Sequence, residues 1–190
     1  MQPMSEKRRI LHPLWSAVMA LFAAGLFALP STVSSRTADT AESETAVVSG
    51  RAKVLDGDTI EIAGTRIRLE GIDAPESAQM CSRKGSGLWP CGKDATEHLK
   101  RMTSGRRVVC NDVGEDRYGR MLGWCAVDGL DINAEMVRSG FAWAFVRYSK
   151  RYVSAEREAR RAEAGIWQGE AEPAWAFRER RRTLRSREQG

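Results

Sequence analysis

The sequence predicts an α+β protein that is mainly β, built as a five-stranded barrel with about three helices. Short segments in which apolar and polar residues alternate, as in half-buried strands, follow one another through residues 47–71. Tight-turn sequences separate these segments. A helical pattern then lies between the third strand and two further strands. Short strands joined by tight turns, with one helix inserted, are typical of a small closed sheet.

The first three strands are expected to form a meander. Val47–Leu55 is the first, and it ends at an Asp-Gly pair, which is a strong hairpin signal. Thr59–Ala63 alternates isoleucine with polar residues. Arg66–Gly71 follows after Gly64 and places Arg68 on its polar face.

The remaining elements are expected further along the chain. Apolar residues at helical spacing predict a helix over Lys93–Ser104, and strands are expected over Arg106–Asn111 and Arg120–Val127. Asp131 can cap a helix over 132–139, and Ser149–Ala164 is an amphipathic helix. Five strands with a helix between the third and the fourth fit the OB-fold, a barrel that commonly binds nucleic acids or sugars.

The N-terminus predicts export. Basic residues at 7–9 precede an uncharged run, Leu14–Leu29, which Pro30 ends. Signal-peptide apolar regions extend to about 15 residues, and a membrane span needs about 20, so the run lies between the two. Two alternatives stay open. Residues 1–30 are a cleaved signal peptide of a secreted or periplasmic protein, or residues 14–29 anchor the chain in a membrane.

Composition divides the rest of the chain. Residues 31–46 are small and polar, which predicts a flexible linker before a folded domain over 47–168. Residues 147–190 hold 12 Lys and Arg against 7 Asp and Glu, whereas residues 37–146 hold 14 against 17. A basic extension over 169–190 would attract polyanions by counterion release. The alternative is a solvated helix face of mixed charge.

The four cysteines favour disulfides. An even number of cysteines behind an export signal is typical of a disulfide framework. A zinc site is disfavoured because there is no C-x-x-C pair and His98 is the only histidine after the signal. Of the three possible pairings we expect one that closes a loop and links two neighbouring strands: Cys81 with Cys91, and Cys110 with Cys125.

Three short motifs place carboxylates and arginines at strand ends. Asp56–Thr59 is an acidic turn whose second aspartate begins a strand, and Asp116–Arg120 delivers an arginine at the start of another. Between them, Arg68–Glu76 combines an arginine with two acids around Pro75. Each motif alone is explained as a charged turn or a surface salt bridge. Together, carboxylates and guanidinium groups suit a hard cation and a phosphate.

The order of these motifs, D-G-D-T, R-L-x-G-I-D-A-P-E and D-R-Y-G-R, resembles the staphylococcal nuclease (thermonuclease) family over roughly residues 47–167. The resemblance implies that Asp58 and Asp73 bind calcium, together with the backbone carbonyl of Ala74. Glu76 resembles the glutamate proposed to activate the attacking water. Arg68 and Arg120 resemble the two arginines that hold the scissile phosphate.

The resemblance implies a monomeric, calcium-dependent endonuclease that cleaves DNA and RNA with little sequence specificity and leaves 3′-phosphates. Tyr118 in its exposed turn is expected to bind substrate by stacking on a base, and Trp89 is a second candidate. Trp143 is expected in the core. Two rival functions stay open: a non-catalytic OB-fold module that binds nucleic acid, or one that binds an anionic polysaccharide.

This sequence departs from the family's best-known member in three ways. It has four cysteines, a longer loop over Ser77–Gly92, and the extension beyond Trp167. The loop follows the predicted active-site acids directly, so we expect it to form a rim of the site that a disulfide closes.

Overall fold

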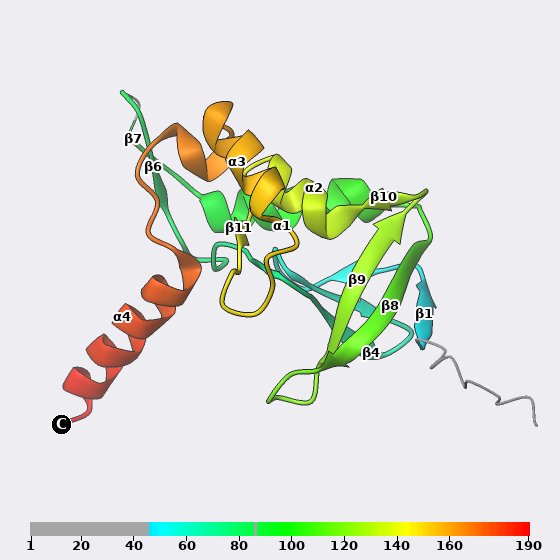
Figure 1. Ribbon diagram of the computed structural model, residues 1–190. Coiled ribbons are helices and arrows are strands. Elements are labelled where there is room, and N and C mark those ends of the chain that lie inside the picture. The colour runs from blue at the N-terminus through cyan, green and yellow to red at the C-terminus, as the bar shows by residue number, and fades with distance from the viewer. Residues whose placement is uncertain (1–45, 86) are drawn as a thin grey trace, which may run out of the picture. The chain divides into compact units, whose positions relative to one another are not determined.

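The computed structural model describes residues 46–85 and 87–190 (Figure 1). The predicted signal or anchor at 1–30, and the predicted linker up to residue 45, therefore lie outside the described residues. Within the described part of the chain, no helix combines the length and the apolar character needed to cross a membrane.

A single mixed sheet forms the body of the protein and confirms the α+β, mainly β class. The strand order is β1-β8-β9-β4-β3-β2, with β10 paired to β9. β4 and β9 are parallel, and the other neighbours are antiparallel. The strands are β1 (Val47–Gly50), β2 (Lys53–Val54), β3 (Thr59–Ile62), β4 (Thr65–Leu69), β8 (Val108–Glu115), β9 (Met121–Val127) and β10 (Leu130–Asp131).

The sheet curls so that the two ends of its strand order approach each other. A Cβ added to Gly50 in β1 would lie 2.9 Å from Ile62 Cγ2 in β3, so these two strands nearly touch. Glycine at position 50 permits the Ile62 side chain to approach the β1 backbone this closely. The curl agrees with the expected barrel, and apolar side chains such as Ile60, Leu69 and Val127 fill its interior.

The three predicted helices are present, and a fourth follows them. They are α1 (Cys91–Thr103), α2 (Ile132–Arg138) and α3 (Val153–Arg161), followed by the short 3-10 helix η1 (Gly165–Gln168) and by α4 (Ala174–Glu188). As predicted, Asp131 caps α2, its carboxylate accepting a hydrogen bond from the Ala134 N–H at 2.9 Å. Figure 1 shows α1, α2 and α3 grouped together, while α4 lies apart from them and ends at the C-terminus.

The segment predicted as a loop over Ser77–Gly92 contains a small hairpin of β6 (Cys81–Arg83) and β7 (Gly87–Trp89). Its local sequence is rich in Gly and Ser, which hides the strand pattern. Both predicted disulfides are present: Cys81–Cys91 joins β6 to the start of α1, and Cys110–Cys125 joins β8 to β9.

A second, smaller core lies beside this hairpin. Trp89, Trp143, Ile166 and Ala174 are buried around the Cys81–Cys91 disulfide. Trp143 is 3% exposed, which confirms its expected place in a core. The expectation that Trp89 offers a base-stacking face is wrong, because its ring is only 5% exposed and packs edge-on against Phe141.

Candidate active site

The acidic turn places Asp58 at the mouth of the β3–β4 hairpin. β3 pairs with β4 so that Thr59 lies opposite Arg68. The Asp58 carbonyl accepts a hydrogen bond from the Leu69 N–H at 2.8 Å, and the Asp56 carboxylate accepts one from the Asp58 N–H at 3.0 Å. The Asp58 side chain is thereby fixed beside Arg68, with the residue only 5% exposed.

A two-stranded pairing fixes Asp73. It ends β5 (Ile72–Asp73), which pairs with β11 (Trp143–Ala144) so that Asp73 lies opposite Trp143. Gly71 turns the chain into β5 at φ +76, a backbone conformation that side-chain-bearing residues rarely adopt. The Asp73 side chain is completely buried, so its charge requires partners inside the protein.

Arg68 bridges the two aspartates. Its Nη1 donates to Asp58 Oδ1, and its Nη2 donates to Asp73 Oδ1 at 3.0 Å. The second oxygen of Asp58 accepts a hydrogen bond from the Ala74 N–H at 3.0 Å. The residues that two separate motifs supply are therefore in direct contact.

The electrostatics of the site favour an additional cation. Burial raises the pKa of the Asp73 carboxyl above its ordinary value, although hydrogen bonds from Arg178 act in the opposite direction. Burial, and after it the charge of Asp58, raises the pKa of Asp56 to about 6. Burial alone would lower the pKa of Arg68, but the charges of Asp58 and Asp73 outweigh it and raise that pKa. For Asp73, the charges of Arg178 and Arg68 act against burial and favour the ionised carboxylate.

Arg178 supplies a cation that the sequence analysis did not identify. From α4 it donates to Asp73 Oδ1 at 3.1 Å and to Asp73 Oδ2 at 2.9 Å, and its Nη1 also reaches Glu76 Oε1 at 2.8 Å. These contacts raise its pKa further, although burial acts to lower it. The guanidinium thus joins Asp73, a predicted metal ligand, to Glu76, the predicted base.

A signal for Arg178 exists in the sequence. Trp175 and Phe177 are large apolar residues at the start of an otherwise charged helix, so they are expected to hold that end against the body. Trp175 stacks on Phe145 with ring centroids 5.7 Å apart. Arg178 is the first arginine of this helix, and it therefore lies closest to the body of the protein.

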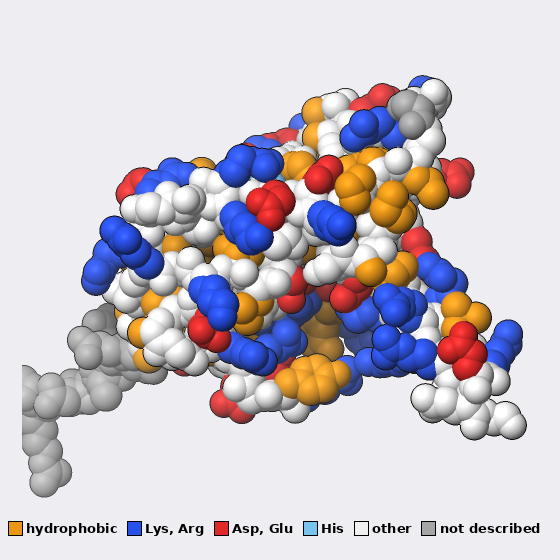
Figure 2. Space-filling model, turned by 180° about the vertical axis from the view of Figure 1, so that it is seen from behind, with side chains coloured by type: hydrophobic (Ala, Val, Ile, Leu, Met, Phe, Trp, Pro, Cys, Tyr) orange, Lys and Arg blue, Asp and Glu red, His pale blue; other side chains and the backbone are white. Residues whose placement is uncertain are grey.

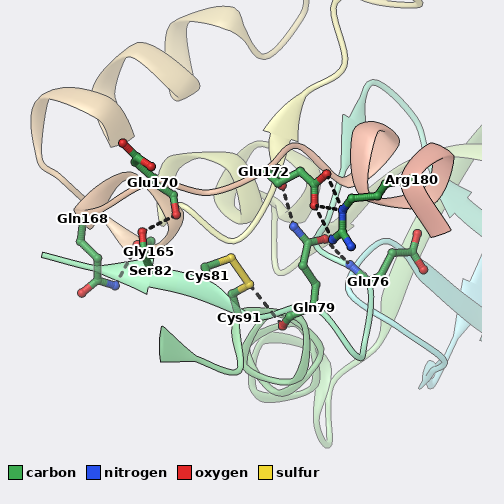
Figure 3. Close-up of a disulfide and its surroundings, with 10 residues drawn as sticks. All are labelled: Glu76, Gln79, Cys81, Ser82, Cys91, Gly165, Gln168, Glu170, Glu172 and Arg180. Carbon is green, nitrogen blue, oxygen red and sulfur yellow. Dashed lines mark hydrogen bonds and ion pairs between the residues drawn. A yellow bond between two sulfur atoms is a disulfide. The ribbon is translucent and has the colours of Figure 1, made fainter. Parts of the chain in front are cut away.

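Gln79 connects the C-terminal segment to Glu76 (Figure 3). It is 1% exposed; its Oε1 accepts from the Glu76 N–H at 3.2 Å, and its Nε2 donates to the Glu172 carbonyl at 2.6 Å. Ser82 adds two hydrogen bonds to the Glu170 carbonyl, from its N–H at 3.0 Å and its hydroxyl at 2.6 Å. The hairpin predicted as a rim therefore also holds the segment from which α4 begins.

The turn that carries Arg120 and Tyr118 is built around Asp116. The carboxylate of Asp116 accepts hydrogen bonds from the backbone N–H groups of Tyr118 at 2.9 Å and Arg120 at 3.0 Å. Within the described residues, the hydrogen bonds of the Arg120 guanidinium go to Asp116, at 2.7 Å for Nε. Tyr118 is 63% exposed, so its ring is accessible. The structure thus brings Asp58, Arg68, Asp73, Ala74 and Glu76 together and leaves Arg120 paired in its own turn.

The comparison with known families decides the relationship. Residues 66–169 match the family described as staphylococcal nuclease homologue. The chain belongs to this family. An endonuclease of Escherichia coli O157:H7, described as uncharacterized, is 39% identical over 143 residues, which cover 70% of this chain and 87% of that protein.

Two further relatives have names that differ from each other. Micrococcal nuclease of Shigella flexneri is 34% identical over 144 residues, covering 66% of this chain and 77% of that protein. The succinoglycan biosynthesis protein ExoI of Rhizobium meliloti is 41% identical over 134 residues, covering 69% and 70%. This staphylococcal nuclease homologue is a nuclease, that is, a hydrolase that acts on nucleic acid. Its helix α4, with Arg178, lies beyond the residues that match the family.

The donor groups of this staphylococcal nuclease homologue fit a hard cation. Asp58 and Asp73 present carboxylate oxygens, and both oxygens of Asp73 already accept hydrogen bonds from the positively charged Arg178. No group of three or more His, Cys, Asp or Glu side chains suited to a metal occurs in residues 46–85 and 87–190. A cation such as calcium, with about six to eight oxygen ligands, would therefore need the Ala74 carbonyl, water and a substrate phosphate as well.

Proposed function

We propose that this chain is an exported, calcium-dependent endonuclease that hydrolyses the phosphodiester bonds of DNA and RNA. The observation that carries the proposal is the contact of Arg68 with both Asp58 and Asp73, with Glu76 linked to Asp73 through Arg178. Two buried carboxylates, one arginine bridging them and a half-exposed glutamate supply the groups for metal-assisted attack on a phosphate.

Asp58, Asp73 and the Ala74 carbonyl would hold the calcium ion, which when bound acts as a Lewis acid on a phosphoryl oxygen. Arg68 is already aligned by Asp58 and Asp73, and it donates hydrogen bonds to the scissile phosphate. Glu76 has a side chain that is 40% exposed, so water reaches its carboxylate. It accepts a proton from a water molecule whose oxygen attacks phosphorus.

Cleavage of the bond between phosphorus and the 5′ oxygen then leaves a 3′-phosphate, and the leaving oxygen takes up a proton. Arg120 completes the site when it exchanges Asp116 for the phosphate. Its hydrogen bonds would strengthen as charge develops on the phosphoryl oxygens. Contacts to phosphate carry no sequence information, so little base specificity is expected.

We also propose that the protein is secreted or periplasmic, or alternatively anchored by residues 14–29, and acts as a monomer. Two disulfides in the described domain support an oxidising compartment. Cell fractionation of the full-length protein tests the location, and sedimentation of the purified protein tests its oligomeric state.

The decisive experiment is a cleavage assay with the purified full-length protein. Plasmid DNA and a structured RNA are incubated side by side with calcium and then with a chelator. We expect calcium-dependent cleavage of both, and end-group analysis that finds 3′-phosphates. Glu76→Gln should slow cleavage by about 10²–10⁴-fold. Arg120→Ala should lower kcat more than it weakens binding, because the charge that it meets develops late.

Two control variants keep the assay specific. Glu97→Gln changes an exposed helix carboxylate, and Arg107→Ala changes an exposed arginine outside the three sequence motifs. Both should leave the rate unchanged. Absence of metal-dependent cleavage by the wild type would favour the rivals, an OB-fold module that binds nucleic acid or polysaccharide without catalysis. Cleavage that survives both site variants would refute the assignment of the site.

A further inference from the structure

Helix α4 carries a row of arginines along one face. Arg178, Arg181, Arg182 and Arg185 are three or four residues apart, so they lie on the same side of the helix. Arg180 and Arg187 lie on the opposite side at this periodicity. Residues 179–190 are all exposed, so packing in a core does not explain why arginines occupy these positions.

The arginine row faces the active site. Its first member, Arg178, contacts Asp73 and Glu76 directly. The four arginines, Phe177 and residues 76–78 line a hollow of about 380 Å³ beside Glu76. Figure 2 shows Asp and Glu side chains at the back of a hollow that Lys and Arg side chains flank. The row therefore continues the site outward from its acids.

The row also lies near the motif that carries Tyr118. A hydrogen bond from Arg117 lowers the pKa of Tyr118, and the charge of Arg182 lowers it further. Arg182 lies 3.7 Å from Glu179, which is a loose contact between two exposed side chains. Arg182, one member of the row, therefore lies close enough to the exposed Tyr118 side chain to influence it.

Docking of the helix start fixes the direction of the row. Gln79 holds the Glu172 carbonyl, and Arg180 donates to the Glu172 carboxylate at 2.8 Å from the opposite side of the helix. Ala174 is buried in the second core. The exposed turns that follow place arginines at i and i+4, at 178 with 182 and at 181 with 185, and like charges at this spacing repel one another. An anion beside the row would relieve this repulsion.

We propose that the arginine row of α4 binds the phosphates of a substrate strand that continues beyond the scissile phosphate. The proposal rests on the proposed function and names the contact that extends its site. Seven residues separate Arg178 from Arg185, about 10 Å along a helix. Each strand of a stacked helix advances about 3.4 Å along the helix axis per phosphate, so the row covers the axial rise of about three phosphates.

The alternative is that the row is a solvated face whose charge acts only diffusely. A comparison of two double variants with equal charge separates the two explanations. Arg182→Gln/Arg185→Gln removes two members of the row, and Arg161→Gln/Arg187→Gln removes two exposed charges that lie off the row, at the end of α3 and on the opposite side of α4. None of these four side chains belongs to the catalytic groups assigned above.

The measurement is binding of a labelled single strand of about 12 nucleotides to the full-length protein in chelator, over a range of salt concentrations. Each phosphate contact contributes about 0.7 to the slope of log affinity against log salt. Loss of two contacts should flatten the slope by about 1.4 and weaken binding about 25-fold near 0.1 M salt. Arg161→Gln/Arg187→Gln should keep the wild-type slope, and Arg182→Lys/Arg185→Lys should restore it.

Equal loss of binding in the two glutamine double variants would overturn the proposal, as would a wild type that does not bind the strand. Because binding is measured without metal, its outcome is separate from that of the cleavage assay. A wild type that cleaves while both double variants bind alike leaves the nuclease site standing and removes the row. A wild type that binds the strand through the row but does not cleave it supports the row and removes the nuclease site.

Discussion

Arg178→Ala removes the guanidinium that lies against two acids of the site. Removal of one partner from a buried ion pair costs about 3–5 kcal/mol of stability. The Arg178 side chain is 32% exposed, so solvent screening reduces the expected loss to about 2 kcal/mol at neutral pH. Urea unfolding in chelator measures this loss, with Arg187→Ala on the exposed opposite face as the control.

The loss should depend on pH. Without Arg178 the pKa of Asp73 rises further above its unfolded value. A carboxyl with a raised folded-state pKa contributes its stability below the unfolded pKa and loses it as pH rises through the folded pKa. The difference between variant and wild type should therefore be small near pH 4 and grow toward pH 7. An equal difference at both pH values would refute the assignment of the effect to charge.

Calcium gives a second readout of the same variant. In the wild type a cation bound at Asp73 must displace Arg178, whereas in Arg178→Ala the carboxylate is already accessible. Calcium should therefore raise the unfolding free energy of the variant more than that of the wild type, because ligand binding stabilises by an amount set by its affinity. A smaller rise of the unfolding free energy in the variant would mean that Arg178 helps to hold the cation and is not displaced by it.

Three further outcomes follow from the contacts described. In urea unfolding, the stability of Asp56→Asn relative to the wild type should increase by about 2 kcal/mol from pH 4 to pH 8. The reason is that the folded-state pKa of Asp56 is about 6 against an ordinary value of 3.8, so the charged carboxylate destabilises the wild type as pH rises. A stability difference that does not change with pH would contradict this. Gln79→Ala leaves the Glu172 carbonyl and the Glu76 N–H without their hydrogen-bond partner. It should lower the free energy of unfolding by about 1–3 kcal/mol and speed tryptic cleavage within α4. Unchanged cleavage would contradict a role for Gln79 in docking the helix. If the Tyr118 ring stacks on a base, Tyr118→Ala should weaken binding of a single strand in chelator by about 1–3 kcal/mol. Tyr118→Phe keeps the ring and should bind like the wild type. Equal losses of affinity in both variants would assign the effect to the hydroxyl group.

The fold and the inner site are largely predictable from local sequence. Asp58 immediately precedes β3 and Arg68 lies on the neighbouring strand β4, so alternation and turn signals suffice to bring them together. Asp73 follows within five residues of Arg68. The disulfide that crosses β8 and β9 is likewise predicted by two cysteines on neighbouring strands.

Contacts over long sequence distances were not predictable in the same way. Arg178 reaches Asp73 across 105 residues, and contacts between distant segments, such as Trp175 on Phe145 and Gln79 on Glu172, fix that approach. Trp89 resembles an exposed aromatic in a Gly/Ser-rich loop, but the disulfide and Ile166 enclose it in a second core. Burial of this kind depends on which distant elements pack together, and a periodicity of two or of 3.6 residues does not contain that information.

The hairpin segment 77–91 is an insertion in the domain whose two ends lie next to each other. A Cβ on Gly92 would lie 1.7 Å from the carbonyl oxygen of Glu76, so the residues that flank the segment touch. An inserted segment whose ends meet can change in length at its exposed tip with little effect on the barrel. The C-terminal segment depends on this insertion, because Gln79 and Ser82 hold Glu170 and Glu172. We therefore expect hairpin and helix to be inherited as one module, with homologous chains keeping both or losing both while the barrel and its acids remain unchanged.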